Sequence, residues 1–118
     1  LGSALTQYGG FKSRGFAIEA VFDNDLSKVG LRLNDTPVMA INRMHEYVRE
    51  NNIDIAIIAV PGRYAQDIAD LLVQSGIKGI LNFAPVTLNI PEEVQVRNVD
   101  LAVNLEILSF NIVVNNEK

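Results

Sequence analysis

The stretch Asn52-Ile-Asp-Ile-Ala-Ile-Ile-Ala-Val-Pro61 decides which fold this sequence predicts. Its residues 53–60 are almost all apolar and rich in β-branched side chains, and the run is too short for a helix. Because apolar and polar residues do not alternate, we expect helices to cover both faces, as in a buried parallel strand. Pro61 and Gly62 end the strand. Ligands of open α/β sheets bind just beyond such strand ends, so we expect a site near Val60 and Pro61.

Strand and helix patterns alternate on both sides of this stretch. Further strands are predicted at 16–22, 29–33, 37–40, 77–83 and 94–99, and helices at 1–8, 42–51, 63–75 and 101–114. This alternation predicts an α/β fold with a Rossmann-like, doubly wound, mostly parallel sheet. The first and central strand of such a sheet is missing from the sequence, so the strands at 16–22 and 53–60 should each have an unpaired edge. Residues upstream or another chain would pair with them.

Composition limits the classes of function. With 118 residues, 48% of them hydrophobic and 20% charged, the chain fits one folded domain. A net charge of −4 argues against direct binding of a nucleic-acid backbone by this segment. The absence of cysteine excludes disulfides and thiolate chemistry and fits a cytoplasmic protein, and no apolar run is long enough for a membrane span. The sequence begins with Leu1, so we expect a piece of a longer protein.

Gly2 and Asp23 form a partial dinucleotide-binding pattern. Gly2 matches the last glycine of a G-x-G-x-x-G motif, and Asp23 follows after about the 20 residues that separate this motif from its ribose-binding acid. An acid here favours NAD over NADP, because it would repel a 2′-phosphate. The spacing between Gly2 and Asp23 is equally compatible with an Asp23 that serves only to form a turn. Lys28 lies near the same rim, where it either offsets pyrophosphate charge or is an ordinary surface lysine.

Beyond these patterns, the chain resembles the C-terminal domain of the Rex family of redox-sensing transcriptional repressors. The resemblance covers nearly the whole sequence in the right order, and the run at 76–85 is its most specific part. The matching segments are Leu1-Gly-Ser-Ala-Leu5, Tyr8-Gly-Gly-Phe11, Gly15-Phe16, Phe22-Asp-Asn-Asp25 with Lys28 and Gly30, Val60-Pro61, Ala65-Gln66, Gly76-Ile-Lys-Gly-Ile-Leu-Asn-Phe-Ala-Pro85, Pro91 and Asn98-Val-Asp-Leu-Ala102.

The resemblance implies a homodimer that senses the ratio of NADH to NAD⁺. NADH would close the dimer and release operator DNA, which a winged-helix domain absent from this sequence would bind. The domain at 1–118 would thus be an N-terminally truncated NAD(H)-binding sensor and dimerisation domain. The implied cofactor-binding residues are Leu1 and Gly2 in the phosphate loop, Asp23 at the adenosine ribose, Lys28 at the rim, Val60 and Pro61 along the middle of the cofactor, and Phe83, Ala84 and Pro85 by the nicotinamide. The implied coupling residues are Tyr8 and Asp100, with Leu101 reaching the partner's nicotinamide pocket.

The last predicted helix gives an independent argument for a dimer. It carries two apolar stripes, one of Leu101, Leu105, Leu108 and Ile112 and one of Val103, Ile107, Phe110 and Val114. A helix that is apolar nearly all round is buried nearly all round, and one face of a sheet cannot cover both stripes. We therefore expect a C-terminal dimerisation helix, with exchange of the helix between subunits as one way to bury it. The alternative is a contact between one stripe and another domain.

Nothing in the sequence predicts catalytic or metal-binding residues. A dehydrogenase needs a proton donor or acceptor near the reacting carbon, and the only histidine, His45, is expected on the core-facing stripe with Met44 and Val48. The apolar rim suits an uncharged, reduced nicotinamide better than a charged one, which is a binding preference and not a reaction. We therefore expect a sensor and not an enzyme. Two alternatives stay open, namely a fragment of a nucleotide- or coenzyme A-binding enzyme and a dimerisation scaffold that binds no nucleotide.

Overall fold

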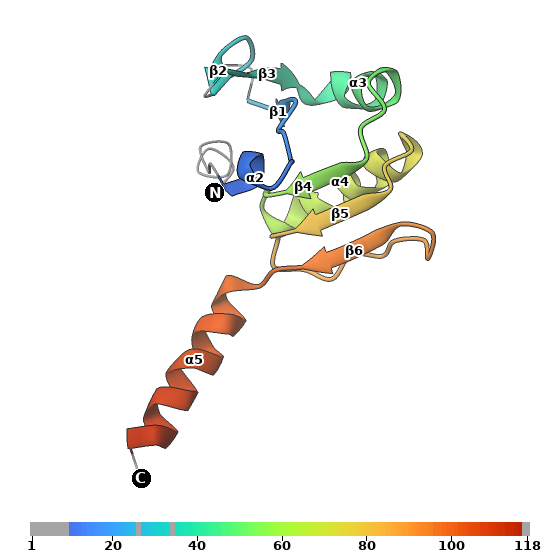
Figure 1. Ribbon diagram of the computed structural model, residues 1–118. Coiled ribbons are helices and arrows are strands. Elements are labelled where there is room, and N and C mark those ends of the chain that lie inside the picture. Colours follow the sequence, from blue (N-terminus) through green and yellow to red (C-terminus); the bar gives the residue numbers. More distant parts are fainter. Residues whose placement is uncertain (1–9, 26, 34, 117–118) are drawn as a thin grey trace.

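The structure is a computed structural model that describes residues 10–25, 27–33 and 35–116. Its elements form two three-stranded sheets with helices packed between and beside them, and a long helix that stands apart (Figure 1). The strands are β1 Val21–Asp23, β2 Arg32–Leu33, β3 Thr36–Ala40, β4 Ile55–Ile58, β5 Gly79–Asn82 and β6 Gln95–Asn98. The helices are α2 Gly10–Ser13, the 3₁₀ turn η1 Ile41–Arg43, α3 Met44–Glu50, α4 Gly62–Gln74 and α5 Leu101–Asn116.

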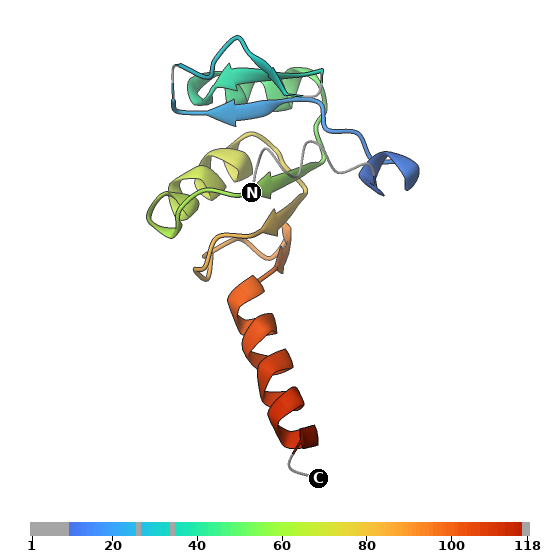
Figure 2. The ribbon, with the colours of Figure 1, turned by 90° about the vertical axis from the view of Figure 1, so that its left-hand side faces the viewer.

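The strand order agrees with a doubly wound sheet that lacks one central strand. One sheet has the order β1-β3-β2, with β1 parallel and β2 antiparallel to β3, and the other is the parallel sheet β4-β5-β6. In Figure 2 the blue arrow of β1 and the green arrow of β4 point the same way. Both are edge strands, and neither free edge has a partner strand within the described residues. The α/β class, the mostly parallel arrangement and the two unpaired edges were therefore predicted correctly.

The predicted strand at 16–22 is much shorter in the structure. Only the three residues of β1 pair, through the register Val21↔Val38, Phe22↔Met39 and Asp23↔Ala40. Phe16 is 55% exposed and lies outside any strand. A strand that has a partner on one side alone makes half of the possible ladder hydrogen bonds, so its ends are not held in the sheet.

The main core lies where α3 and α4 pack on the parallel sheet. Ala65, Ala69 and Leu72 are buried and Ile68 is half-buried, and together they form the apolar stripe of α4, the helix predicted at 63–75. Gly76, at φ +91°, ends the helix and lets Ile77 turn back into the core. From the other elements, the core cluster takes Met44, Val48, Ile58, Ile77, Ile80 and Ala84.

The second face of β4 is open, contrary to our expectation. Ile58 is buried against α4, but Ile55 and Ile57, on the opposite face, are 54% and 36% exposed. Side chains alternate between the two faces of a strand, so an apolar run can cover both faces only if two layers of structure exist. Within the described part of the chain, helices pack on one face of this strand alone.

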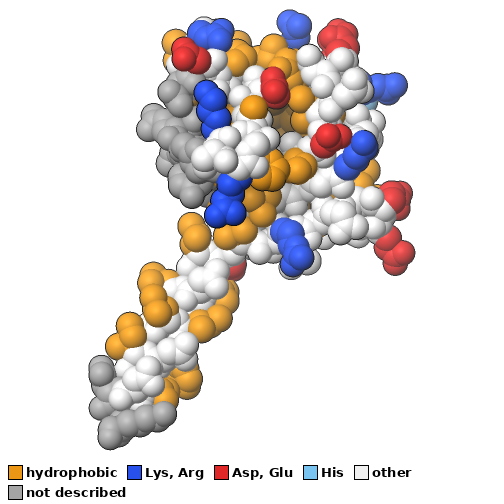
Figure 3. Space-filling view, in the orientation of Figure 1, with side chains coloured by type: hydrophobic (Ala, Val, Ile, Leu, Met, Phe, Trp, Pro, Cys, Tyr) orange, Lys and Arg blue, Asp and Glu red, His pale blue; other side chains and the backbone are white. Residues whose placement is uncertain are grey.

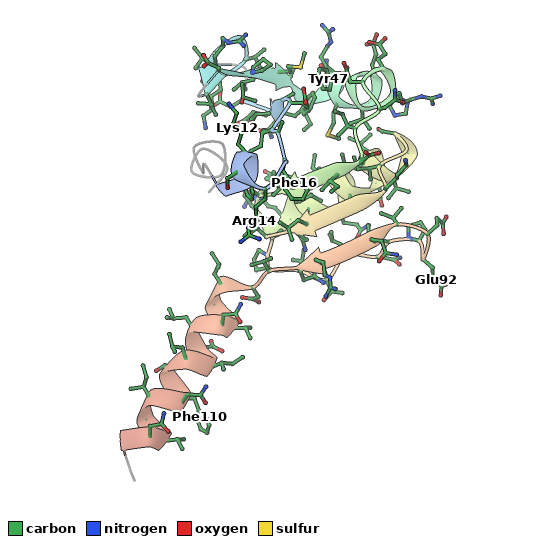
Figure 4. The ribbon with its side chains drawn as sticks, in the orientation of Figure 1. Lys12, Arg14, Phe16, Tyr47, Glu92 and Phe110 are labelled. Atoms are coloured by element: carbon green, nitrogen blue, oxygen red, sulfur yellow. The ribbon has the colours of Figure 1, made fainter. Side chains whose placement is uncertain are left out.

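Helix α5 projects away from both sheets (Figures 1 and 2). From Leu101 to Val113 all its side chains are exposed, and eight of them are large and hydrophobic. Figure 3 shows these hydrophobic side chains along the helix, whereas the charged ones gather on the two-sheet body. Phe110, 67% exposed, lies far along α5 from the body (Figure 4). Neither α5 nor another helix in the described ranges is long and apolar enough to cross a membrane.

Candidate functional site

The candidate site lies where the parallel strands end. Loops start after β4 and β5, and the segment that leads into α5 starts beside them, after β6. In the other sheet, β1 points the same way as β4 and is also followed by a loop (Figure 2). Carboxyl ends of parallel strands are the usual place for ligands in open α/β sheets. Leu1, Gly2 and Tyr8, predicted as phosphate-loop and coupling residues, lie outside the described residues.

Asp23 is the last residue of β1 and begins a turn. Its Oδ1 accepts a hydrogen bond of 2.9 Å from the backbone N–H of Asp25, which fixes the direction of the carboxylate. Its Oδ2 lies 3.9 Å from Nζ of Lys28, a loose ion pair in which the Asp23 side chain is 31% exposed. Such an ion pair is weak in water, so the outer carboxylate oxygen remains able to accept hydrogen bonds from a ligand.

Asp25 serves the same turn and not the site. The Ser27 hydroxyl and backbone N–H both donate to its Oδ1, at 2.7 and 3.0 Å. These bonds, the hydroxyl first, hold the pKa of Asp25 below its ordinary value, and Lys28 adds a smaller effect in the same direction. The turn that carries Asp23 and Lys28 is thus held in shape by hydrogen bonds of its own.

The turn after β4 and the loop after β5 touch each other. Val60 is half-buried against the core and Pro61 is exposed. A Cβ on Gly62 would lie 2.7 Å from Cγ1 of Val86, so only glycine permits this approach without displacing Val86. Sequence reasoning used Gly62 only to end the strand. A glycine directly after a strand-ending proline was the one available signal for this close contact.

The loop after β5 carries the three residues predicted to lie by the nicotinamide. Phe83 is half-buried, and its N–H donates to the carbonyl of Ile58 at 2.9 Å. Ala84 is 6% exposed and belongs to the core cluster, whereas Pro85 is exposed. The structure therefore places this loop beside the end of β4, next to Val60 and Pro61. Among its three residues, Pro85 offers the most open surface.

Asn82 shapes this loop and was missed in the sequence. It is fully buried, and its side-chain Oδ1 accepts from the N–H of Ala84 at 3.0 Å. Its Nδ2 donates to the Val86 carbonyl at 3.1 Å. A single amide thus closes the loop over residues 83–86 by standing in for backbone partners. The sequence signal was a lone polar residue at the end of an apolar strand.

Asp100 has a structural role at the base of α5. Its Oδ1 accepts from the N–H of Val103 at 3.0 Å, the bond of an N-terminal helix cap. Leu101, Leu105, Leu108 and Phe110 follow on the exposed helix, at 60%, 67%, 56% and 67% exposure. Their predicted contacts with a partner are consistent with this exposure but are not tested by it.

His45 does not face the core, contrary to our expectation. Met44 and Val48 are buried as predicted, but His45 is exposed, with Nδ1 2.9 Å from Oγ of Ser75. The Ser75 hydroxyl donates its only proton to the carbonyl of Leu71 at 2.6 Å, so Nδ1 of the histidine is the donor. The histidine thus ties α3 to the end of α4. No group of acidic, histidine or cysteine side chains in the described ranges is arranged to hold a metal ion.

Comparison with known proteins places this architecture in a family. The family model for the CoA binding domain matches residues 1–86. The chain belongs to the CoA-binding domain family. The matched residues include β1 to β5 and the loops that follow β1, β4 and β5.

The resemblance to Rex repressors is confirmed. The chain is 61% identical over 112 residues to the redox-sensing transcriptional repressor Rex of Carboxydothermus hydrogenoformans, covering 95% of this chain and 54% of that protein. It is 43% identical over 111 residues to Rex of Streptomyces coelicolor, covering 94% of this chain and 43% of that protein. The chain thus spans about half the length of the curated relatives that it matches.

Solved structures agree in fold with this chain. The crystal structure of RSP, a Rex-family repressor, matches with a TM-score of 0.92 at 35% identity, over 98% of this chain and 55% of that one. Crystal structures of RSP in complex with β-NADH, and with β-NAD⁺ and operator DNA, match with TM-scores of 0.91.

Proposed function

We propose that this chain is the NAD(H)-binding sensor and dimerisation domain of a transcriptional repressor that responds to the NADH/NAD⁺ ratio. NADH binding closes the dimer and releases operator DNA, which a winged-helix domain outside this sequence contacts. The repressor acts in the cytoplasm, where the chromosome lies. One observation carries the proposal: Asp23, a carboxylate with an available oxygen, ends β1, which points the same way as β4 (Figure 2), and two apolar loops meet at Gly62 and Val86 beyond β4 and β5.

The residues at this edge suit the parts of a dinucleotide. Asp23 would accept hydrogen bonds from the adenosine ribose hydroxyls, with Lys28 beside it to offset phosphate charge. Val60 and Pro61 would lie along the middle of the cofactor, and the loop of Phe83, Ala84 and Pro85 would border the nicotinamide. When bound, the cofactor supplies two oxidation states that differ in the charge of this ring. Apolar surroundings disfavour the charged ring, which supports a preference for NADH.

A binding role, without turnover, agrees with the relatives, which are named as transcriptional repressors. Proton transfer would need a titratable group beside the nicotinamide loop. The loop itself offers Phe83, Ala84 and Pro85, and the chain's histidine is engaged with Ser75 between α3 and α4. We therefore propose a sensor and not an enzyme.

Helix α5 supports the homodimer. Eight large hydrophobic side chains on a single projecting helix are more than a monomeric surface normally exposes in one place. A second copy offers a matching helix and the open face of β4 with Ile55 and Ile57. Exchange of α5 between subunits would bury both surfaces at once.

A second candidate, coenzyme A binding, is favoured by the name of the matching family. The ribose of coenzyme A carries a 3′-phosphate, and the Asp23 carboxylate would repel it, just as such an acid repels the 2′-phosphate of NADP. A fragment of a coenzyme A-binding enzyme is therefore the less favoured proposal. A titration with coenzyme A under the same conditions as NADH separates the two candidates.

The experiment that tests the proposal replaces Asp23 with alanine in the full-length protein. Losing a hydrogen bond to a charged group costs about 1.5–3 kcal/mol, so Asp23→Ala should weaken NADH binding about 10- to 150-fold. Asp54→Ala removes a carboxylate that is 66% exposed just before the amino end of β4, opposite to the site, and should keep most of the affinity. Fluorescence titration with NADH measures both. Equal affinity in Asp23→Ala and the unsubstituted protein would contradict the proposal, as would tighter binding of coenzyme A than of NADH.

A further inference from the structure

Asn82 and Asn98 occupy the last paired positions of neighbouring strands. In the register of the parallel sheet, Asn82 of β5 lies between Ile58 of β4 and Asn98 of β6. Asn82 is fully buried, whereas Asn98 is exposed. The loop with Phe83 follows one of them directly, and Val99 and Asp100 alone separate the other from α5. The pair therefore stands between the proposed nicotinamide loop and the proposed dimerisation helix.

The buried amide of Asn82 bonds to both sides. Its Nδ2 lies 3.1 Å from the carbonyl oxygen of Val86, 3.3 Å from that of Ala84 and 3.1 Å from Oδ1 of Asn98. Two hydrogens are thus divided among three acceptors, two in the loop and one at the end of β6. The backbone repeats the link, because the N–H of Val99 donates to the Asn82 carbonyl at 2.8 Å.

This arrangement makes the loop and the base of α5 depend on each other. Because two hydrogens cannot fully satisfy three acceptors, a shift of Val86 away from Nδ2 strengthens the bond to Asn98, and a shift toward Nδ2 weakens it. Val86 is also the side chain that touches Gly62, at the meeting point of the two apolar loops. A ligand that moves this loop therefore acts on the Asn98 bond and on the start of α5.

We propose that Asn82 and Asn98 are a positioning pair that transmits occupancy of the nicotinamide loop to α5. The inference rests on the proposed function and adds residues that neither the sequence patterns nor the resemblance had singled out for this role. Asn82 holds the loop, and its hydrogen bond to Asn98 links the loop to the end of β6. Asp100 caps the helix that follows.

The test uses Asn98, because it is exposed and its replacement leaves the core intact. Asn98→Ala removes the acceptor, and Asn98→Asp keeps an acceptor oxygen at the same place. Hydrogen exchange of the full-length protein is followed by mass spectrometry without and with NADH, and NADH affinity is measured by fluorescence titration. Without NADH, Asn98→Ala should slow exchange in the 83–86 loop, because both hydrogens of Nδ2 then go to the carbonyls of Ala84 and Val86, and Asn98→Asp should leave this exchange unchanged.

With NADH, Asn98→Ala should bind about fivefold more weakly, as for one neutral hydrogen bond, yet lose the NADH-induced change of exchange at the first turn of α5. Asn98→Asp, which keeps the acceptor oxygen, should retain that change. If Asn98 had a structural role alone, keeping the acceptor would not preserve the response to NADH. The inference is overturned if Asn98→Ala keeps the change at α5, or if Asn98→Asp loses it equally. An unsubstituted protein that binds no NADH overturns the proposed function and this inference with it, so the two failures are distinguishable.

Discussion

Replacing Leu105 with alanine should weaken the dimer strongly. Leu105 is 67% exposed on α5, and its surroundings on the helix offer nothing to bury it. Complete burial of a leucine side chain contributes roughly 1.5–3 kcal/mol, so two-thirds of it contributes about 1–2 kcal/mol. A symmetric dimer has two such helices, and the substitution should cost about 2–4 kcal/mol in total. The dissociation constant of the dimer should then rise by about 30- to 1000-fold.

Sedimentation equilibrium over a concentration series measures this dissociation constant. Alanine is the best helix former, so Leu105→Ala leaves α5 itself intact and changes only the surface that it offers. Asn111→Ala, on the same exposed helix, is the matched control and should change the constant little. The reasoning would be refuted by a monomeric unsubstituted protein at micromolar concentration, or by an equal dissociation constant for Leu105→Ala.

Two further substitutions test the core and the contact between the loops. Leu72 is 3% exposed, so Leu72→Ala should lower the free energy of unfolding by about 2–5 kcal/mol. Urea denaturation measures this loss, and a loss below about 1 kcal/mol would mean that the core is less tightly packed than described. Gly62→Ala should displace Val86, whose Cγ1 would lie 2.7 Å from the new Cβ, and so weaken NADH. Its unfolding free energy should change by only about 1 kcal/mol, because better helix propensity offsets the crowding. Unchanged NADH affinity would show that the two loops do not act together.

The sequence predicted most of the elements, because their periodicity is strong. The stripe of α4 and the all-round apolarity of α5 are local patterns that three-dimensional packing did not override. The alternation of strands and helices also indicated a sheet lacking its central strand, and the edges of β1 and β4, which no strand of the described residues pairs, agree. Asp23 stood out because its spacing from Gly2 has a chemical reason.

What the sequence could not predict depends on neighbours in space. The run through Ile55 and Ile57 indicates two buried faces, but the pattern does not say which chain segment covers the second one. Gly62 is required by Val86, 24 residues away, and no local rule identifies such a contact. Asn82 likewise looks like an ordinary strand-ending residue until its bonds to Asn98 are seen.

The most direct test of the central claim is a titration of the full-length protein with NADH and with NAD⁺ under identical conditions. Isothermal titration calorimetry gives both dissociation constants. An apolar loop beside the nicotinamide predicts tighter binding of NADH than of NAD⁺, because burial disfavours the charged ring. Equal affinities would contradict the account, since a ligand pair without differential binding cannot report a redox ratio.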